Sequence, residues 1–368
     1  MLFKALAVAL VAVVLSYCLR VLYSLGFHLH NFQHKPGVCR KVEGIPPGSE
    51  DMRMLSDGSV FITSGYMTNL ASPSFKEFYF KHRENGGIFF VNLTAPNVEA
   101  KEVQILESAS FQLANFFPHG LDVVENKESG RHVIFVVNHV IGSRDRIEKF
   151  RYLPKTSQLE HLASFSGKEL GLCNDVAALS KDAFYVTNSM YSNGLPWSIL
   201  EGLSFIKKGS IVFNDGSGFS EVVSNIRLPN GITISKDESF VYVAMDNDLY
   251  VYQRAKDNKL TLIQEVPLNT LVDNCFIPES GDVLYVGAHP VLYKLLGHLD
   301  EPSQGAPSQV LALPLRQGKV LEEGIRELLY DEGALISGSS VAVPHQGRIL
   351  VGSVMSSLVL CDVNVPLD

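Results

Sequence analysis

The chain has 368 residues, of which 46% are hydrophobic and 19% are charged, as in an ordinary globular protein. Its formal net charge of −8 argues against a nucleic-acid partner, which requires basic patches. The sequence lacks the Cys-x-x-Cys and His-Glu-x-x-His spacings of common zinc sites. It also lacks the Gly-x-Ser-x-Gly elbow of the α/β hydrolases, so the sequence indicates neither a zinc site of these types nor an α/β-hydrolase serine.

The N-terminal segment is the most apolar part of the chain. Residues 5–27 are almost wholly apolar, and Arg20 is the one charged residue among them. About 20 such residues span a membrane, and Ser16-Tyr17-Cys18 is a poor cleavage site. We therefore expect residues 1–27 to form an uncleaved signal anchor and residues 28–38 to be a linker. A cleaved signal peptide, and hence a secreted protein, is the alternative.

The body, residues 39–368, contains six stretches that resemble one another. Each begins with a polar residue, runs through a short apolar strand and a turn, and enters a second, more hydrophobic strand. In the clearest copy, residues 229–237 precede the apolar run Phe240–Ala244. The six starting positions lie 43 to 69 residues apart, a spacing typical of the four-stranded blades of a propeller. We therefore predict an all-β fold, a six-bladed β-propeller.

Polar residues occupy the same position in all six stretches. In a propeller the innermost strand of each blade lines one central channel, so residues at matching positions meet at one end of it. Five of the six carry a carboxylate, carboxamide or imidazole, and this ring is the candidate site. The aligned residues are Glu50, His119, Asn174, Asn230, Asp273 and Ser339, and those that follow them are Asp51, Gly120, Asp175, Gly231, Asn274 and Ser340.

Two cysteines bracket the predicted propeller. Cys39 precedes the first strand and Cys361 lies in the last, and closure of the ring brings the first and last blades together. A disulfide between them would close a loop of over 300 residues and contribute about 4–5 kcal/mol in the chain-entropy model. Two separate buried thiols are the alternative. Together with the glycosylation sequon at Asn92, the cysteines favour a propeller that is extracellular or in the lumen of the endoplasmic reticulum.

Two segments depart from the strand pattern. Residues 64–86 are rich in aromatic side chains and form either a lid over one end of the channel or a loop packed on the neighbouring blade. Within residues 188–208, apolar side chains recur at helical spacing and two lysines end the stretch. This pattern predicts an amphipathic surface helix that suits a membrane interface, with packing over the propeller as the alternative.

Several motifs in this frame resemble those of one family. From about Cys39 to Cys361 the chain is similar to the paraoxonases, which are calcium-dependent lactonases and arylesterases with a six-bladed propeller. The N-terminal hydrophobic segment also resembles that family. The motifs that carry the resemblance are Gly48-Ser49-Glu50-Asp51, Phe117-Pro118-His119-Gly120, Val137-Asn138-His139, Cys173-Asn174-Asp175, Pro229-Asn230-Gly231-Ile232, Leu271-Val272-Asp273-Asn274, Val286-Gly287-Ala288-His289-Pro290 and Gly338-Ser339-Ser340-Val341.

The resemblance implies two calcium ions and a histidine base. His119 would be the general base and His139 would orient it or relay its proton, although His139 as a satisfied core histidine is an alternative. Cys39 and Cys361 would correspond to the family's disulfide. The catalytic calcium would be held by Glu50, Asn174, Asn230, Asp273 and Asn274, and a second, structural calcium by Asp51, Asp175 and the carbonyl of Leu121.

The chemistry of these residues agrees with the implied sites. Calcium takes six to eight oxygen ligands from carboxylates, amides, carbonyls and water. Each implied set contains two carboxylates, whose charges neutralise one divalent ion. The ion would polarise an ester or lactone carbonyl, and a neutral imidazole at His119 would accept a proton from water.

By the resemblance, the protein would hydrolyse lactones and aryl esters at a membrane or lipoprotein surface. Phe117, Ala288 and the run Thr187–Tyr191 depart from the family's pattern and would alter the choice of substrate. The rival interpretation is a non-catalytic, paraoxonase-like chaperone or accessory subunit with membrane-protein clients. A sugar- or lipid-binding propeller is a third.

Overall fold

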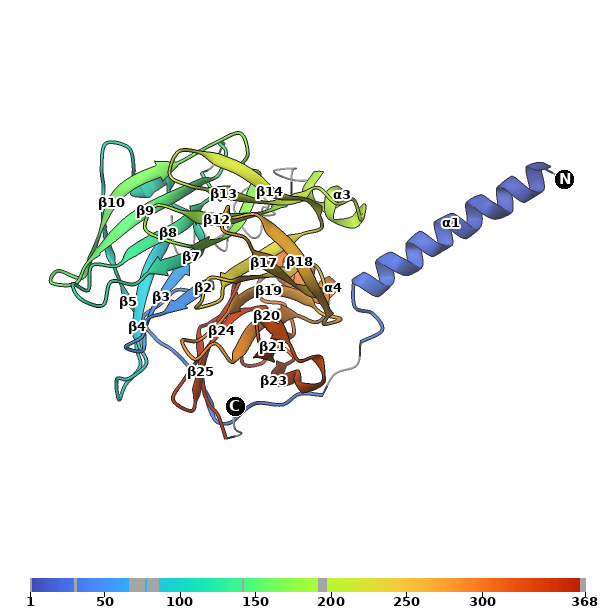
Figure 1. Cartoon of the computed structure of the whole chain (residues 1–368). Coiled ribbons are helices and arrows are strands. Elements are labelled where there is room, and N and C mark those ends of the chain that lie inside the picture. The colour runs from blue at the N-terminus through green and yellow to red at the C-terminus, as the bar shows by residue number, and fades with distance from the viewer. Residues whose placement is uncertain are drawn as a thin grey trace.

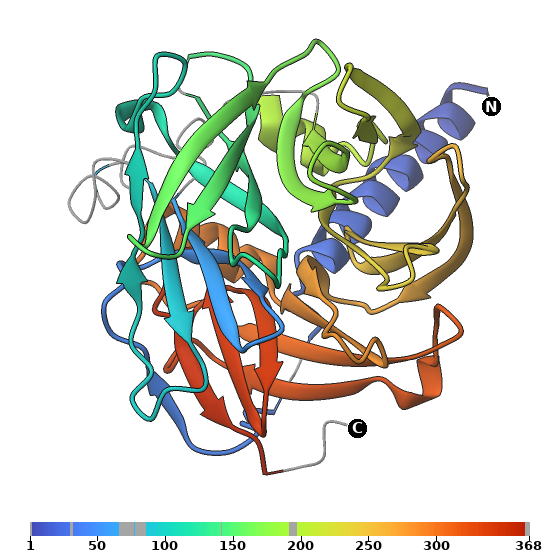
Figure 2. The ribbon, with the colours of Figure 1, turned by 60° about the vertical axis from the view of Figure 1, so that its left-hand side comes forward.

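The computed structural model describes residues 2–29, 32–65, 77, 86–140, 142–190 and 197–364. Six sheets stand around one axis, and helix α1 (Leu2–Ser24) projects away from them (Figures 1 and 2). Each sheet has four or five strands, and consecutive sheets follow one another along the chain. The prediction of an all-β, six-bladed propeller with an N-terminal apolar helix is confirmed.

Blades 1 to 3 come from the first part of the chain; blades 1 and 3 begin with their innermost strand, whereas blade 2 begins with its outermost strand. Blade 1 contains β2 (Ser49–Met54), β3 (Ser59–Ser64), β4 (Gly87–Asn92) and β5 (Lys101–Glu102). Blade 2 contains β7 (Pro118–Val124), β8 (Val133–Asn138), β9 (Arg146–Leu153), β10 (Gln158–Phe165) and, outermost, β6 (Gln104–Leu106). Blade 3 contains β11 (Leu172–Ala178), β12 (Phe184–Met190), β13 (Gly209–Asn214) and β14 (Phe219–Ile226).

Blades 4 to 6 complete the ring. Blade 4 contains β15 (Pro229–Ile234), β16 (Phe240–Met245), β17 (Asp248–Arg254) and β18 (Leu260–Pro267). Blade 5 contains β19 (Leu271–Phe276), β20 (Val283–His289), β21 (Ser308–Arg316), β22 (Lys319–Val320) and β23 (Arg326–Asp331). Blade 6 contains β24 (Ser339–His345), β25 (Arg348–Ser353), β26 (Val359–Asp362) and the N-terminal β1 (Cys39–Lys41).

The core lies between neighbouring blades. The second strand of each blade is rich in β-branched and aromatic residues, which favour a pleated, buried surface. In β8, for example, five of the six residues are buried. Tyr242 and Leu284 belong to one cluster that joins blades 4 and 5. Because each blade packs mainly on its neighbours, the core grows around the ring and leaves the inner strands to line the channel.

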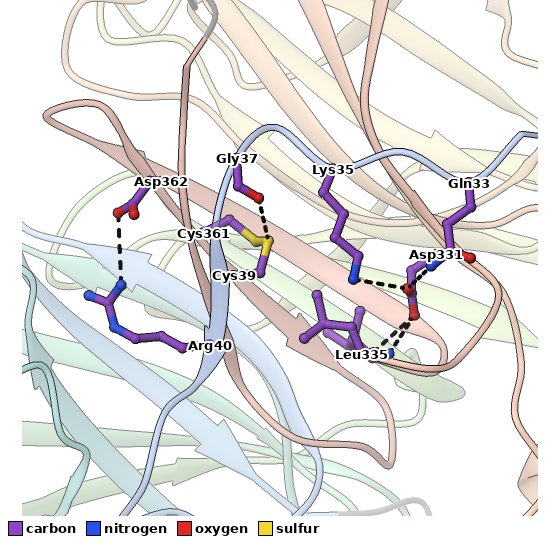
Figure 3. The surroundings of a disulfide bond; sticks show 10 residues. Gln33, Lys35, Gly37, Cys39, Arg40, Asp331, Leu335, Cys361 and Asp362 are labelled. Atoms are coloured by element: carbon purple, nitrogen blue, oxygen red, sulfur yellow. Dashed lines mark hydrogen bonds and ion pairs between the residues drawn. A yellow bond between two sulfur atoms is a disulfide. The ribbon is translucent and has the colours of Figure 1, made fainter.

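The two ends of the propeller meet in blade 6. Strand β1 pairs antiparallel with β26, and Cys39 lies directly opposite Cys361. The two cysteines form a disulfide that links residues 322 positions apart (Figure 3). Nearby, Gln33 Nε2 donates a hydrogen bond to Asp331 Oδ1 at 3.0 Å. The predicted closure of the ring and its disulfide are therefore confirmed.

Helix α1 is exposed from Lys4 to Arg20, and Tyr17 and Arg20 contact the body. Residues Lys4–Ser24 are long and apolar enough to cross a membrane, a property that signal anchors and signal sequences share. Tyr17 Oη donates to the carbonyl oxygen of Leu203 at 3.0 Å. The guanidinium groups of Arg20 and Arg227 both lie over the Phe205 ring. They are 5.0 Å and 4.5 Å from the ring centre, respectively.

The two segments outside the strand pattern have different outcomes. The predicted amphipathic helix is α3 (Trp197–Leu203), only seven residues long, and Leu200 and Ile206 are 54% and 55% exposed. The predicted lid lies outside the described residues except for its ends and residue 77. A helix that the sequence did not indicate, α4 (Leu292–Asp300), follows β20 and buries Leu295 and His298. Asn92 is exposed at the end of β4.

Candidate metal and catalytic site

Every inner strand carries the same irregularity near its start. The pairing with the second strand skips two residues: Ser49 pairs with Ser64, and the next pair is Met52 with Ile62. Such bulges re-aim side chains and are common beside functional sites. The skipped residues are Glu50–Asp51, His119–Gly120, Asn174–Asp175, Asn230–Gly231, Asp273–Asn274 and Ser340–Val341.

In blade 6 the predicted alignment is wrong by one residue. Ser339 pairs with Ser353, so Ser340 takes the ring position. Ser340 Oγ donates to the carbonyl oxygen of Glu50 at 2.6 Å. Ser339 Oγ instead bonds the backbone of Gln309, on β21 of blade 5. The sixth blade therefore contributes a hydroxyl that holds the backbone of the first.

The outer ligand set, Glu50, Asn174, Asn230, Asp273 and Asn274, leaves several buried oxygens without a partner. Unsatisfied buried acceptors are rare and costly in folded proteins. The Asn274 amide nitrogen donates to Glu50 Oε1 at 2.8 Å, which leaves the amide oxygen free. The buried oxygens without a hydrogen-bond partner in this set are Glu50 Oε2, Asn174 Oδ1, Asn230 Oδ1 and Asn274 Oδ1.

This donor set fits a calcium ion. It combines two carboxylates with three amide oxygens, all hard oxygen ligands of the kind calcium prefers. In the described part of the chain, no group of three or more His, Cys, Asp or Glu side chains is arranged as a metal site, so the fit depends on the asparagines. Burial raises the pKa of Glu50 well above its ordinary value, and the charges of Asp273 and Asp51 raise it further. A bound cation would relieve both effects.

The inner set lies one residue further along the same strands. Asp51 and Asp175 are fully buried, and burial raises the pKa of both carboxyl groups. Asp51 Oδ2 accepts the Leu121 N–H at 2.8 Å, and Asp175 Oδ2 accepts the Ile232 N–H at 2.8 Å. The two carboxylates therefore bridge adjacent blades through backbone N–H groups. Their charges and oxygens fit a second divalent ion, although none of these oxygens lacks a hydrogen bond.

Two histidines form a short chain beside the outer set. His119 Nε2 lies 3.1 Å from Glu50 Oε1, and His119 Nδ1 lies 2.9 Å from His139 Nε2. His139 Nδ1 in turn lies 3.0 Å from Asp145 Oδ2, an ion-pair distance without hydrogen-bond geometry. Burial lowers the pKa of His119 from its ordinary value of 6.5, against the opposing charges of Asp273, Asp51 and Asp145. Burial of His119 therefore favours its neutral imidazole form.

A family model described as Arylesterase matches residues 33–363, nearly the whole body. The chain belongs to the arylesterase family. It is 30% identical over 367 residues to chicken (Gallus gallus) serum paraoxonase/arylesterase 2, with 98% of this chain and 99% of that protein covered. It is also 30% identical over 332 residues to human serum paraoxonase/arylesterase 1, with 88% of each chain covered. Family membership supports hydrolysis of esters or lactones.

Solved structures with low sequence identity share the fold of this arylesterase-family chain. The PQQ domain of pyranose dehydrogenase from Coprinopsis cinerea has a TM-score of 0.52 at 13% identity and covers 91% of this chain and 98% of its own. A luciferin-regenerating enzyme has a TM-score of 0.51 at 12% identity, with 89% and 99% covered. At this identity the likeness concerns the fold alone.

Three charged or titratable residues of the channel in this arylesterase-family chain had no role in the sequence-based prediction. Asp145 lies beside His139, and His289 Nε2 lies 2.7 Å from Asp273 Oδ2. Arg53 lies deeper in the channel and pairs with Asp122. His289 belongs to a motif that carried the family resemblance, but Asp145 lies outside the repeats, and Arg53 occupies a repeat position at which no other blade has an arginine. Only the contacts in the folded chain reveal the roles of Asp145 and Arg53, because their partners come from other strands or blades.

The channel has a separate hollow at its other end. A pocket of about 210 Å³ is lined by residues near the C-terminal ends of the inner strands, among them Arg53, Asp122, Thr233 and Phe276. It contains no member of the outer ligand set and neither histidine of the pair. We therefore assign the candidate hydrolytic site to the opposite end, where the orphaned oxygens and His119 lie together.

Proposed function

We propose that the protein is a calcium-dependent hydrolase of lactones and aryl esters. One observation carries this proposal: four buried oxygens of the outer ligand set lack a hydrogen-bond partner, and Glu50 of that set lies 3.1 Å from His119, a buried histidine whose pKa burial lowers. The names of the relatives, paraoxonase, arylesterase and lactonase, support the substrate class. A calcium ion bound by the outer set would polarise the substrate carbonyl and stabilise the negative charge that develops on its oxygen.

His119 is the proposed general base. Its neutral form accepts a proton at Nε2, the nitrogen that faces the outer set through Glu50. The other nitrogen, Nδ1, then carries the hydrogen and donates it to His139 Nε2. His139 Nδ1–H faces the Asp145 carboxylate, which is fully buried and stabilises positive charge on the pair. In this arrangement Asp145 selects the tautomer, and His139 relays the proton or orients His119.

The inner set is proposed to hold the second, structural calcium. Asp51, Asp175 and the Leu121 carbonyl would be its protein ligands, and Asp51 already binds the Leu121 N–H. This ion would join the inner strands of blades 1 to 3 near the axis. Because metal binding to the folded state adds to folding free energy, the ion would stabilise the propeller.

The proposed location is a membrane, with the propeller on the extracellular or lumenal side. The disulfide and the exposed Asn92 sequon support an oxidising, glycosylating compartment. Residues 1–27 would be the anchor, and the exposed Leu200 and Ile206 lie near its end, where they suit a membrane or lipoprotein surface. A secreted form would result from cleavage of the same segment.

Hydrolysis of a panel of lactones and aryl esters by the full chain tests this function. We expect turnover that is lost in chelator and restored by calcium. Wild-type protein without turnover above background on the whole panel would contradict the enzyme. If the surface level of a membrane-protein client nevertheless depended on the chain, the accessory-subunit interpretation would replace it.

A further inference from the structure

Arg53 crosses the channel beneath the inner set. It is only 5% exposed and lies two residues after Asp51 on β2. Its Nε donates to Asp122 Oδ1 on β7 at 2.9 Å. Its Nη1 and Nη2 donate to the carbonyl oxygens of Cys275 on β19 and Ile232 on β15, at 3.1 and 3.0 Å. The guanidinium of blade 1 is thus bonded to blades 2, 4 and 5.

Asp122 extends these contacts to a further blade. Its Oδ2 accepts the Ala178 N–H on β11 at 2.7 Å, and its Oδ1 also accepts the Val123 N–H at 2.8 Å. The Arg53–Asp122 pair therefore bonds the inner strands of five blades at the axis. A buried charge is tolerated where it is paired and hydrogen-bonded; Arg53 is paired with Asp122, and each of its three guanidinium nitrogens donates a hydrogen bond.

The same guanidinium acts on the inner carboxylates. Ile232 connects Arg53 with Asp175: its N–H donates to the Asp175 carboxylate, and its carbonyl oxygen accepts from Arg53. Burial raises the pKa of Asp51 and Asp175, and the positive charge of Arg53 opposes that rise in both. Arg53 itself is held in its charged form against burial by Asp122, Asp51 and Asp175. The permanent positive charge of Arg53 thus attracts the two carboxylates that are proposed to hold the second calcium.

We propose that Arg53 is a built-in counter-charge of the inner carboxylate pair, which keeps the propeller folded without the inner calcium and lowers that site's affinity for the ion. This inference rests on the proposed inner site. Without calcium, Arg53 offsets the repulsion between Asp51 and Asp175. With calcium bound, the same fixed charge repels the divalent ion. Arg53 therefore stabilises the calcium-free protein more than the calcium-bound protein.

Thermal unfolding of the full chain against free calcium concentration tests this linkage. The variant R53M/D122N removes both members of the Arg53–Asp122 pair, so that neither is left without the other. We expect its calcium-free Tm to fall more than its calcium-saturated Tm. We also expect the calcium concentration for half-maximal stabilisation to fall on the order of tenfold, which corresponds to about 1.4 kcal/mol. Folding only in calcium would be the extreme form of the expected result.

A matched control separates this linkage from a general loss of stability. Arg227, in the connection before β15, and Asp246, which follows β16, form a part-buried ion pair at 2.5 Å. R227M/D246N should change the Tm but leave the calcium response as in wild type. Equal calcium responses of wild type and R53M/D122N would overturn the proposal. If R53M/D122N does not fold even in calcium, Arg53→Gln takes its place, and an unchanged calcium response of that variant overturns the proposal equally.

A second series of variants tests whether the response of the Tm to calcium comes from the inner ligand set. In the Asp273→Ala background the outer set loses one of its two carboxylates, while Asp51 and Asp175 are intact. The larger calcium response of R53M/D122N should persist there. Its disappearance would overturn the inner-site proposal and leave the outer ion, and with it the proposed hydrolysis, untouched. Failure of hydrolysis alone leaves this thermal measurement interpretable, because its readout is unfolding.

Discussion

His119 Nδ1 lies 2.9 Å from His139 Nε2, and both imidazoles are buried. A neutral imidazole has one donor and one acceptor nitrogen, so the state of one ring decides the state of the other. Asp145, 3.0 Å from His139 Nδ1, favours the hydrogen on that atom. The lone pair of His119 is then at Nε2, which lies 3.1 Å from Glu50 Oε1, and two acceptors at this distance require a proton or a cation between them. This relationship leads to the first two predictions.

His119→Gln should remove the base without removing a proposed metal ligand. General-base catalysis accelerates a reaction about 10²–10⁴-fold, so we expect kcat/KM on a lactone to fall by that factor and some activity to remain. The Tm should change little. His345→Gln, at the end of β24 and away from the histidine pair, is the matched control and should hydrolyse like wild type. Wild-type kcat/KM in His119→Gln would remove His119 from the mechanism.

The pH dependence of hydrolysis should reflect a base with a lowered pKa. In the proposed mechanism activity requires neutral His119, and burial lowers the pKa of His119 from the ordinary 6.5. The rate should therefore be constant through neutral pH and fall only as the pH drops below that ordinary value. Asp145→Asn should lower kcat and change this profile, since the tautomer and the charge of the pair depend on Asp145. A fall in kcat with the wild-type pH profile would assign Asp145 a merely structural role.

Asp273→Ala should impair hydrolysis more severely than His119→Gln. It removes one of two carboxylates from the outer set, and with it both the charge that holds the ion and the partner of His289. The inner set is unchanged, so the propeller should still gain thermal stability from calcium. Parallel measurements of turnover and of Tm with and without chelator check both expectations. Hydrolysis at the wild-type level in this variant would exclude the outer set as the catalytic centre.

The Cys39–Cys361 disulfide should contribute substantially to the stability of the ring. Because it closes the first strand on the last, its loss should lower the free energy of unfolding by up to about 5 kcal/mol. Urea unfolding of Cys39→Ser measures this loss, and Cys18→Ser, an exposed free cysteine, is the control. A non-reduced digest should contain the linked peptides. Two free thiols in that digest would contradict the bond and favour a cytosolic propeller.

Glycosylation of Asn92 reports the side of the membrane on which the propeller lies. Asn92 is exposed, and the Thr94 hydroxyl of the same sequon donates to its side-chain oxygen at 2.7 Å. Translation with microsomes should add a glycan that glycosidase removes, and Asn92→Gln should lack it. Retention of the N-terminal segment in the product, read by mass, distinguishes an anchor from a cleaved signal. An unmodified, protease-accessible propeller would place the body in the cytosol.

The blades and most of the ring could be predicted from the amino-acid sequence alone. Each blade repeats a local pattern of polar start, apolar strand and turn, and such patterns are visible without knowledge of distant contacts. The alignment failed only in blade 6, where Ser339 and Ser340 are identical in type. There the pairing of β24 with β25, and not the residue types, decides which serine faces Glu50.

Which charges balance one another could not be predicted from the sequence and depends on the folded ring. Arg53 finds its partners 69, 179 and 222 residues away, and Asp145 finds His139 across a turn that carries no repeat. The free energy of a buried charge depends on partners placed within a few ångströms, and the ring of blades brings distant residues to that range only when it closes. The inner strands could therefore be predicted from the sequence, whereas the cation beneath the inner carboxylates required the closed propeller.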